Sequence, residues 1–371
     1  MEQRLKEMSE SYVEKVFFDA IYIQGNTAWI YTHNINGLYL LNLDTYEIQF
    51  KGMVPDVWIF ETGLYSCILK SGKYLILVPL KAKKIAIYDI EKEKFECYPK
   101  INEEDFFYSG CVFDGKVFLI GQNRPYITVF NITTNDIYYI KSGKEWFRNR
   151  KVIKGRFFGR KDRTVVGKYY YYAICNDNAV ARLDMESESV TYFEIKGCSN
   201  GMRMMCQEGD DFWITEWDRA SVIKWNENEG IIAKSKFKEV SSDIFRTGEM
   251  IYTDKLWLFP TVGDHVLIYD DKIDKWSKVE AFDKYGINTC ERCHPWRQTF
   301  PVAIKQDNYL YVFSGYTCDF IRYNLVNSNI MARKIVLNIE EVIDMYKKKY
   351  NKIKFLIEND SCFLKEFIRT L

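Results

Sequence analysis

Short apolar runs that alternate with polar residues recur along almost the whole chain. In each repeat, one such run ends in Leu or an aromatic residue that is followed directly by Asp or Asn. Alternation with a period of two predicts β-strands rather than amphipathic helices. The pattern occurs seven times, at Leu41-Asn42, Tyr88-Asp89, Phe130-Asn131, Leu183-Asp184, Trp225-Asn226, Tyr269-Asp270 and Tyr323-Asn324.

Each of these pairs lies between two further strand-like runs. A more aromatic run precedes it, such as AWIYT at 28–32 or YLILV at 74–78, and a third run such as FECY follows after a polar turn. We expect the Asp or Asn side chain to accept a hydrogen bond from the backbone two residues on and so to close the turn into the next strand. This role is structural, and we assign no ligand to these side chains.

The repeat covers residues 16–336, which gives about 46 residues for each of seven units. Four strands at that period match one blade of a β-propeller. The pattern resembles the kelch and WD-repeat propellers at the level of the fold, although the Gly-Gly doublet of kelch blades and the full Gly-His and Trp-Asp signatures of WD repeats are missing. We therefore predict an all-β fold, a seven-bladed β-propeller of four-stranded blades. No functional residue of a named family carries over.

The two ends of the chain differ from the repeat. Residues 1–15 form an N-terminal extension, 16–336 the propeller, and 337–371 a short helical C-terminal tail. In the tail, Asn338 and Glu341 have the spacing of a helix-capping box, and a second helix is predicted from Asp360 or Ser361. The tail either packs on the ring and covers a blade edge, or docks a protein partner. Whether 1–15 or 329–336 supplies the last edge strand also stays open.

Composition narrows the class of protein. Apolar residues make up 47% and aromatic residues 16%, which supports a packed core and excludes a disordered chain. The formal net charge of +1 offers no global attraction to nucleic acid or to an anionic membrane. The charged N-terminus lacks the apolar core of a secretory signal, and no apolar stretch is long enough to span a membrane. We expect a cytoplasmic protein whose ten cysteines are reduced and act mostly as small hydrophobic residues.

Two insertions lengthen the loops that precede the innermost strands of the fourth and seventh blades. The first, residues 141–163, carries ten Lys and Arg against two acids, a net charge of +8, so the rest of the chain has −7. Such a segment can steer an anion. Its aromatic residues, Trp146, Phe147, Phe157 and Phe158, interleave with the charges as in sites that stack planar groups. The alternative is a solvated loop whose charges pair with acidic neighbouring blades.

The upper mouth of the central channel, where the innermost strands begin, is the predicted ligand site. Three arginines of blades four to six fall near this level, and converging guanidiniums suit carboxylate or phosphate. The alternative is that each arginine bonds to neighbouring backbone or to Asp19, Glu208 or Glu249. Alignment on the turns places Asp19, Tyr65, Tyr108, Arg160, Arg203, Thr247 and Phe300 at one level, with Arg246 one residue away. The predicted ligand-binding residues are Arg160, Arg203, Arg246, Trp217, Tyr108, Asp19, His33, Trp296 and Arg297.

The second insertion contains Cys290, Cys293 and His294 in the string C-E-R-C-H. The string matches a covalent haem-attachment motif, but haem of this kind follows export, and no signal sequence is evident. Zinc would need a fourth ligand that the sequence does not supply. We therefore expect no cofactor and no metal, and we interpret these residues as thiols and an imidazole of a rim loop.

Catalytic motifs are scarce. The sequence has no G-x-S-x-G, H-E-x-x-H or P-loop, and we expect the rim acids Asp19, Glu216, Asp218 and Asp264 to be solvent-exposed. The predicted function is a non-catalytic binding or scaffolding module that captures an anionic small molecule, an acidic peptide or an anionic glycan. The alternative is a lyase or glycoside-active enzyme that acts on an anionic carbohydrate. The low net charge argues against RNA or single-stranded DNA as the partner.

Overall fold

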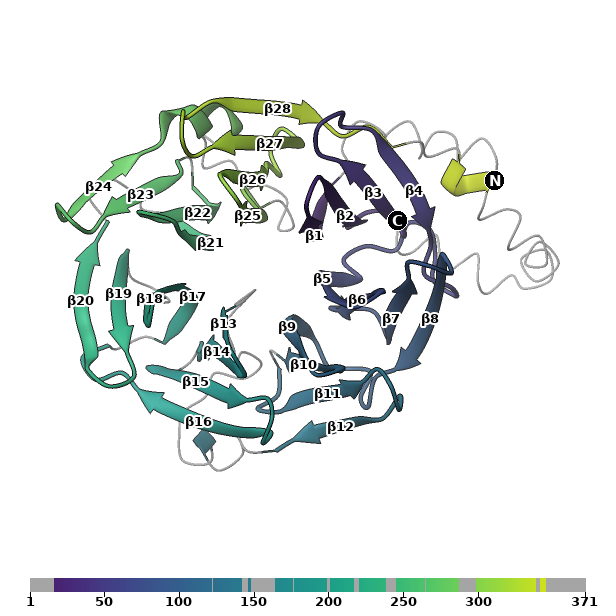
Figure 1. Cartoon of the computed structure of the whole chain (residues 1–371), viewed down its shortest axis with the longest axis horizontal. Coiled ribbons are helices and arrows are strands. Elements are labelled where there is room, and N and C mark those ends of the chain that lie inside the picture. The colour runs from purple at the N-terminus through teal and green to yellow at the C-terminus, as the bar shows by residue number, and fades with distance from the viewer. Residues whose placement is uncertain are drawn as a thin grey trace, which may run out of the picture.

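Seven four-stranded antiparallel sheets stand as blades around a central axis, which confirms the predicted seven-bladed β-propeller (Figure 1). In each blade the strands follow chain order from the axis to the rim. The computed structural model describes residues 17–121, 123–141, 146–147, 164–175, 177–198, 201–216, 220–237, 245–263, 265–286, 298–337 and 341–344. Among them, no helix is long and apolar enough to cross a membrane.

Each blade is one consecutive stretch of chain. Blade 1 holds β1 (Phe18–Gln24), β2 (Thr27–Thr32), β3 (Leu38–Asn42) and β4 (Ile48–Gly52), and blade 2 holds β5 (Tyr65–Ser71), β6 (Tyr74–Pro79), β7 (Lys84–Asp89) and β8 (Lys94–Pro99). Blade 3 holds β9 (Phe107–Phe113), β10 (Lys116–Gly121), β11 (Ile127–Asn131) and β12 (Ile137–Ile140), and blade 4 holds β13 (Thr164–Val166), β14 (Tyr169–Ala173), β15 (Ala179–Asp184) and β16 (Ser189–Glu194).

The remaining three blades follow the same order. Blade 5 holds β17 (Met202–Glu208), β18 (Asp211–Glu216), β19 (Ser221–Asn226) and β20 (Gly230–Lys236), and blade 6 holds β21 (Arg246–Tyr252), β22 (Leu256–Val262), β23 (Leu267–Asp270) and β24 (Lys275–Lys278). A short 3-10 helix, η1 (Glu280–Tyr285), precedes blade 7, which holds β25 (Val302–Gln306), β26 (Tyr309–Phe313), β27 (Asp319–Asn324) and β28 (Ile330–Lys334).

The repeated Asp or Asn has the predicted role in all seven blades. Each is the last residue of the third strand, and its side-chain oxygen accepts the backbone N–H two residues on at 2.8 to 3.2 Å. In blade 1, for example, Asn42 accepts the N–H of Asp44 at 2.9 Å. The local bond fixes where the third strand ends, which is why the spacing of these residues reports the blade period.

The hydrophobic core is divided among the joints between blades. Seven clusters of buried side chains are present in the described part of the chain, and each joins two neighbouring blades. At the joint between blades 5 and 6, for example, the buried Trp213 packs edge-on against Tyr269 with ring centroids 5.5 Å apart. Large aromatic residues fill these wedge-shaped joints, so the aromatic-rich sequence is a direct consequence of the fold.

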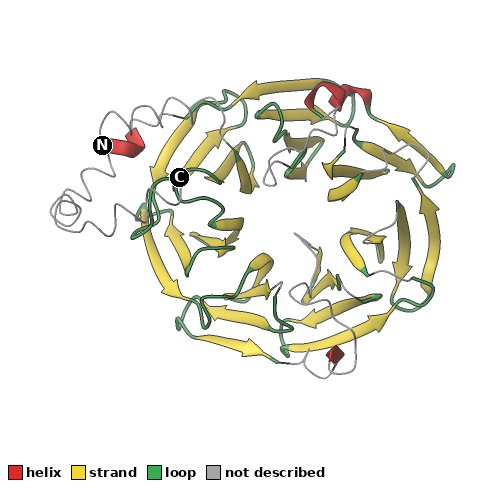
Figure 2. Ribbon diagram, turned by 180° about the vertical axis from the view of Figure 1, so that it is seen from behind, coloured by secondary structure: helices red, strands yellow, loops and turns green. Residues whose placement is uncertain are grey.

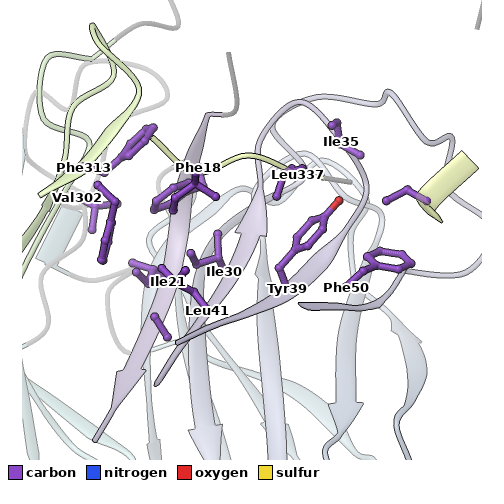
Figure 3. Close-up of a cluster of buried hydrophobic side chains, with 14 of the residues drawn as sticks. Phe18, Ile21, Ile30, Ile35, Tyr39, Leu41, Phe50, Val302, Phe313 and Leu337 are labelled. Atoms are coloured by element: carbon purple, nitrogen blue, oxygen red, sulfur yellow. The ribbon is translucent and has the colours of Figure 1, made fainter. Parts of the chain in front are cut away.

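Blade 7 takes its outermost strand from residues 330–334, which answers the question of the last edge strand. In the described residues no strand is shared between blade 7 and blade 1. Side-chain packing closes the ring there, with Phe18 of β1 stacked on Phe313 of β26 at 4.0 Å between ring centroids (Figure 3).

The chain beyond β28 packs back on the ring as far as the structure describes it. Leu337 and Val342 are buried in the cluster that joins blades 7 and 1. The helical turn formed by 341–344 lies at the outside of the ring, beside blade 1 (Figure 2). The predicted cap at Asn338 and the predicted second helix at Asp360 or Ser361 lie outside the described residues.

Candidate functional site

A set of β-bulges marks the upper mouth of the channel. Among the residues that the structure describes, five innermost strands shift their pairing with the second strand by one residue near the strand's start. A bulge leaves one residue outside the regular ladder and re-aims its side chain, and bulges are common beside functional sites. We call the five bulged residues the bulge ring: Asp19, Ser66, Tyr108, Arg203 and Gly248.

Alignment of the seven repeats on their turns predicted the position of the bulged residue correctly in three blades. In two other blades the predicted position is one residue too early. Asp19, Tyr108 and Arg203 are equivalent, as expected. In blade 2 the bulged residue is Ser66 and not Tyr65, because the turn of blade 2 begins at Gly72 rather than at Ser71.

Blade 6 is the second blade in which the predicted bulged residue is one position too early. Its bulged residue is Gly248 and not Thr247, because the turn 253–255 has three residues where the other described turns between first and second strands have two. Phe300 was also misplaced by one residue, because the turn of blade 7 begins at Asp307 and so puts Pro301 at this level; Phe300 itself is buried in the core between blades 6 and 7.

Arg203 is buried at this mouth, with 8% of its surface exposed. Its guanidinium Nη2 donates to the hydroxyl of Thr261, 3.3 Å away on β22 of the next blade. Arg203 is therefore not part of a solvated rim, whereas Arg246, the first residue of β21, is exposed. A buried guanidinium keeps its charge and so must be matched by acceptors or by an anion.

Thr261 connects three blades at this point. Its hydroxyl accepts from Arg203 of blade 5 and donates to the backbone carbonyl of Arg246 in blade 6 at 3.1 Å. Its own carbonyl accepts the backbone N–H of Thr299, at the entrance to blade 7, at 2.9 Å. The guanidinium of Arg203 and the backbone of Arg246 thus meet at one hydroxyl.

Gly248 makes room for this arrangement. A Cβ atom on residue 248 would lie 2.5 Å from Cγ2 of Thr261 and 3.0 Å from its backbone nitrogen. Both distances are shorter than ordinary contacts between carbon atoms. An isolated glycine inside a strand pattern signals a bulge or a close approach, so this residue could have been singled out from the sequence.

Hydroxyl groups also cross the joints on the other side of the ring. Ser66 of blade 2 donates to the carbonyl of Phe107 in blade 3 at 2.8 Å, and the Tyr170 hydroxyl of blade 4 donates to Ser109 of blade 3 at 3.1 Å. Sequence reasoning missed Ser66, Ser109 and Thr261, because a hydroxyl residue in a strand gives no signal of its partner in another blade.

Two glutamates differ from what the sequence predicted: Glu208 as an alternative partner of the arginines, and Glu216 as a solvent-exposed rim acid. Glu208 is the last residue of β17, about 16 Å along the strand from Arg203, and it binds Lys224 at 2.8 Å, so it is excluded as a partner of Arg203. Glu216 is not a solvent-exposed rim acid, because its side chain is fully buried and bound to Lys234 at 2.9 Å and to Ser221. Glu249 follows Gly248 and is also buried.

Two aromatic residues of the basic insertion attach it to blade 4. Trp146 stacks on Tyr192 of β16 at 4.8 Å between ring centroids, and its indole N–H donates to Asp177 at 2.9 Å. Phe147 is buried in the cluster between blades 3 and 4. Phe147 is therefore not available to stack a planar ligand, and one face of the partly buried Trp146 is already occupied by Tyr192. Phe157 and Phe158 lie outside the described residues.

The two described histidines, His33 and His265, lie in loops of the upper face. The ring of His33 packs edge-on against Phe17 at 5.2 Å, and a Cβ atom on Gly63 would meet its Cε1 at 3.2 Å. His265, in the loop before β23, places Nδ1 2.8 Å from a carboxylate oxygen of Asp283 in η1. A carboxylate in this position orients an imidazole, an arrangement that catalytic and purely structural histidines share.

Several predicted site residues lie outside the described part of the chain. No group of three or more His, Cys, Asp or Glu that could hold a metal ion occurs among the described residues, but the C-E-R-C-H loop is not part of them. The side chain of Asp19 is likewise not described, although its backbone lies in β1. The other candidates outside the described residues are Arg160, Trp217, Asp218, Asp264, Cys290, Cys293, His294, Trp296 and Arg297.

No protein-family model matches the chain, and no curated protein matches its sequence. Solved structures with a similar fold include a catalytically inactive histidine-to-alanine variant of virginiamycin B lyase from Staphylococcus aureus with Quinupristin, with a TM-score of 0.61 and 14% identity over 82% of this chain and 94% of that chain. The computationally designed Ika8 protein has a TM-score of 0.57 and 7% identity over 86% and 87%. A chain of the Mitotic Checkpoint Complex has a TM-score of 0.52 and 10% identity over 88% and 90%. At such identities the likeness concerns the fold alone, and the chain is a seven-bladed β-propeller.

Proposed function

We propose that this propeller is a binding module that captures an anionic ligand at its upper channel mouth. The observation that carries the proposal is the buried guanidinium of Arg203, which a β-bulge re-aims and the hydroxyl of Thr261 holds across a blade joint. A guanidinium presents a planar fork of donors that matches carboxylate or phosphate. Tyr108 adds a hydroxyl group to the same ring of bulged residues, whereas the buried Ser66 hydroxyl already donates to the carbonyl of Phe107.

The charge distribution of the chain supports an anion. The segment 141–163, with its net charge of +8, rejoins the ring at Thr164, the first residue of β13. This strand neighbours β17, which carries Arg203. A segregated positive segment raises the local concentration of anions and speeds their capture.

Anion binding to the purified protein tests this function, with inorganic phosphate and a hexaglutamate peptide as probes. We expect binding that weakens as salt is added, because added ions screen the field. Arg203→Ala should weaken binding by about 1.5–3 kcal/mol, roughly 10- to 150-fold, the range for a hydrogen bond to a charged group. Isothermal titration calorimetry measures the effect for each probe.

Arg333→Ala is the matched control, because Arg333 is an exposed arginine of the outermost strand β28. It should leave the affinity unchanged. Circular dichroism and thermal melting establish that Arg203→Ala is folded before its affinity is compared. A folded Arg203→Ala protein that binds both probes as well as the parent, or a parent protein that binds neither, would contradict the proposal.

A second candidate is an enzyme of the lyase or glycoside-active class acting on an anionic carbohydrate. The observation that favours catalysis is the pair of His265 and Asp283, whose 2.8 Å contact orients the imidazole as in general-base sites. Virginiamycin B lyase shares the fold and loses activity when a histidine is replaced. Incubation with uronic-acid oligosaccharides, followed by liquid chromatography, tests this candidate. Conversion that disappears in His265→Ala would support it, and no conversion of any of these compounds would count against it.

A further inference from the structure

The joint between blade 7 and blade 1 differs from the other six joints of the ring. At each of those six, the chain itself runs from the outermost strand of one blade to the innermost strand of the next. Blades 7 and 1 lie at opposite ends of the repeat, and in the described residues no strand of one pairs with the other. Non-covalent contacts must therefore keep this joint closed.

The lower half of the joint is held by polar contacts. Arg322 of β27 donates to a carboxylate oxygen of Asp44 at 3.2 Å, and Gln306 of β25 donates to the carbonyl of Gly25 at 2.7 Å. Both partners in blade 1 lie in turns of the lower face. These two contacts are exposed, and exposed ion pairs and hydrogen bonds of this kind contribute little stability. Tyr46, in the same lower turn as Asp44, also packs edge-on against Phe320 of blade 7 at 6.4 Å between ring centroids.

The upper half of the joint is covered by the chain that follows β28. Leu337 and Val342 belong to the same buried cluster as Phe18 of blade 1 and Phe313 of blade 7. Figure 3 shows Leu337 above Tyr39 and Leu41, next to the strands of blade 1. Ile335 and Ile343 complete the set of buried apolar side chains that this segment contributes.

The surface that receives the segment comes from the upper loops of blade 1. Its buried residues Ile35, Met53, Ile59 and Phe60 belong to the same cluster. The helical turn lies close enough to β3 that the charge of Glu341 adds to burial, the larger cause, in raising the pKa of the Tyr39 hydroxyl. The segment therefore bridges from the end of blade 7 to the outer part of blade 1.

We propose that residues 335–337 and 341–344 form a clasp that keeps the ring closed at the joint between blades 7 and 1. Without the clasp, the upper half of this joint would expose its apolar loops, and β1 would separate from β25 and β26 more often. Because Asp19 of the bulge ring lies on β1, opening of this joint would also distort the upper mouth of the channel. The clasp is independent of the proposed ligand and of its chemistry.

Two substitutions of the same kind in the full-length chain test the clasp. Val342 has no exposed surface, whereas Val336, in the same segment, is 64% exposed. Val342→Asp should lower the midpoint of thermal unfolding by about 3–6 °C, and Val336→Asp should shift it by less than about 1 °C. Hydrogen exchange followed by mass spectrometry then locates the effect.

Exchange in the Val342→Asp protein should accelerate by about an order of magnitude in β1, β25 and β26 and stay unchanged in β9 and β10, on the far side of the ring. Acceleration that is equal in all blades, or absent from the joint, would overturn the proposal. If Val342→Asp does not fold, Val342→Ala gives the same readout with a smaller change, and the same two outcomes decide.

Discussion

Replacement of Gly248 by alanine tests how the bulge ring is built. The added Cβ atom would lie 2.5 Å from Cγ2 of Thr261 and 3.0 Å from its backbone nitrogen. Carbon atoms in contact are normally 3.5–4.0 Å apart, so β21 or β22 must move by about an ångström. Overpacking of this size costs about 1–3 kcal/mol of unfolding free energy. The same movement would shift the Thr261 hydroxyl that holds Arg203.

Gly121→Ala is the matched control for this experiment. Gly121 is the last residue of β10, and a Cβ atom there would meet its nearest neighbour, the carbonyl of Tyr126, at an ordinary 3.6 Å. Urea denaturation should therefore show Gly121→Ala within about 0.5 kcal/mol of the parent, the usual range for a substitution without a named defect. If Gly248→Ala is as stable as Gly121→Ala, the close approach of Thr261 does not require glycine, and our account of this bulge is wrong.

Two further predictions concern side chains that hold single blades. Accepted hydrogen bonds, first from the N–H of Ser187 and then from Lys168, lower the pKa of Asp184, so its stabilising contribution is present at neutral pH and disappears as the pH falls through that lowered value. Asp184→Asn keeps the turn, as Asn42 does in blade 1, and should reduce the loss of melting temperature between pH 7 and pH 3. Asn36 is fully buried and binds Tyr31, Val54 and Val57, so Asn36→Ala should lower the unfolding free energy in urea by about 2–4 kcal/mol through the unsatisfied groups left behind. Equal pH dependence in the first case, or unchanged stability in the second, would contradict these accounts.

The fold could be predicted because its signals are local. A bond from Asn42 to the backbone of Asp44 needs only neighbouring residues, and it recurs in every blade at the same place. Period-two alternation likewise depends on which face of one strand is buried. Neither signal needs information about another blade, so the number of blades and the order of strands follow from the chain alone.

The register at the channel mouth was harder to predict, because it depends on which residue of each turn string still belongs to the strand. The string SGK puts Ser71 in the strand, whereas DGK puts Asp114 in the turn. This difference of one residue moved the expected level from Ser66 to Tyr65. The roles of Thr261 and Ser66 could not be predicted either, since their partners lie in other blades and become neighbours only when the ring closes.

The basic insertion shows why composition alone does not define a ligand. Aromatic residues among cations suggest a surface that stacks bases, yet Trp146 and Phe147 are committed to Tyr192, Asp177 and the core of the neighbouring blades. These two rings serve as an anchor. Within the insertion, Trp146 and Phe147 therefore attach it to the ring of blades, and its Lys and Arg residues carry the positive charge. A ligand attracted by charge alone must gain its specificity elsewhere, and Arg203, buried and held across a blade joint, offers a directional group for an anion. For this reason we favour a compact carboxylate or phosphate at the mouth over a nucleic-acid strand stacked along the insertion.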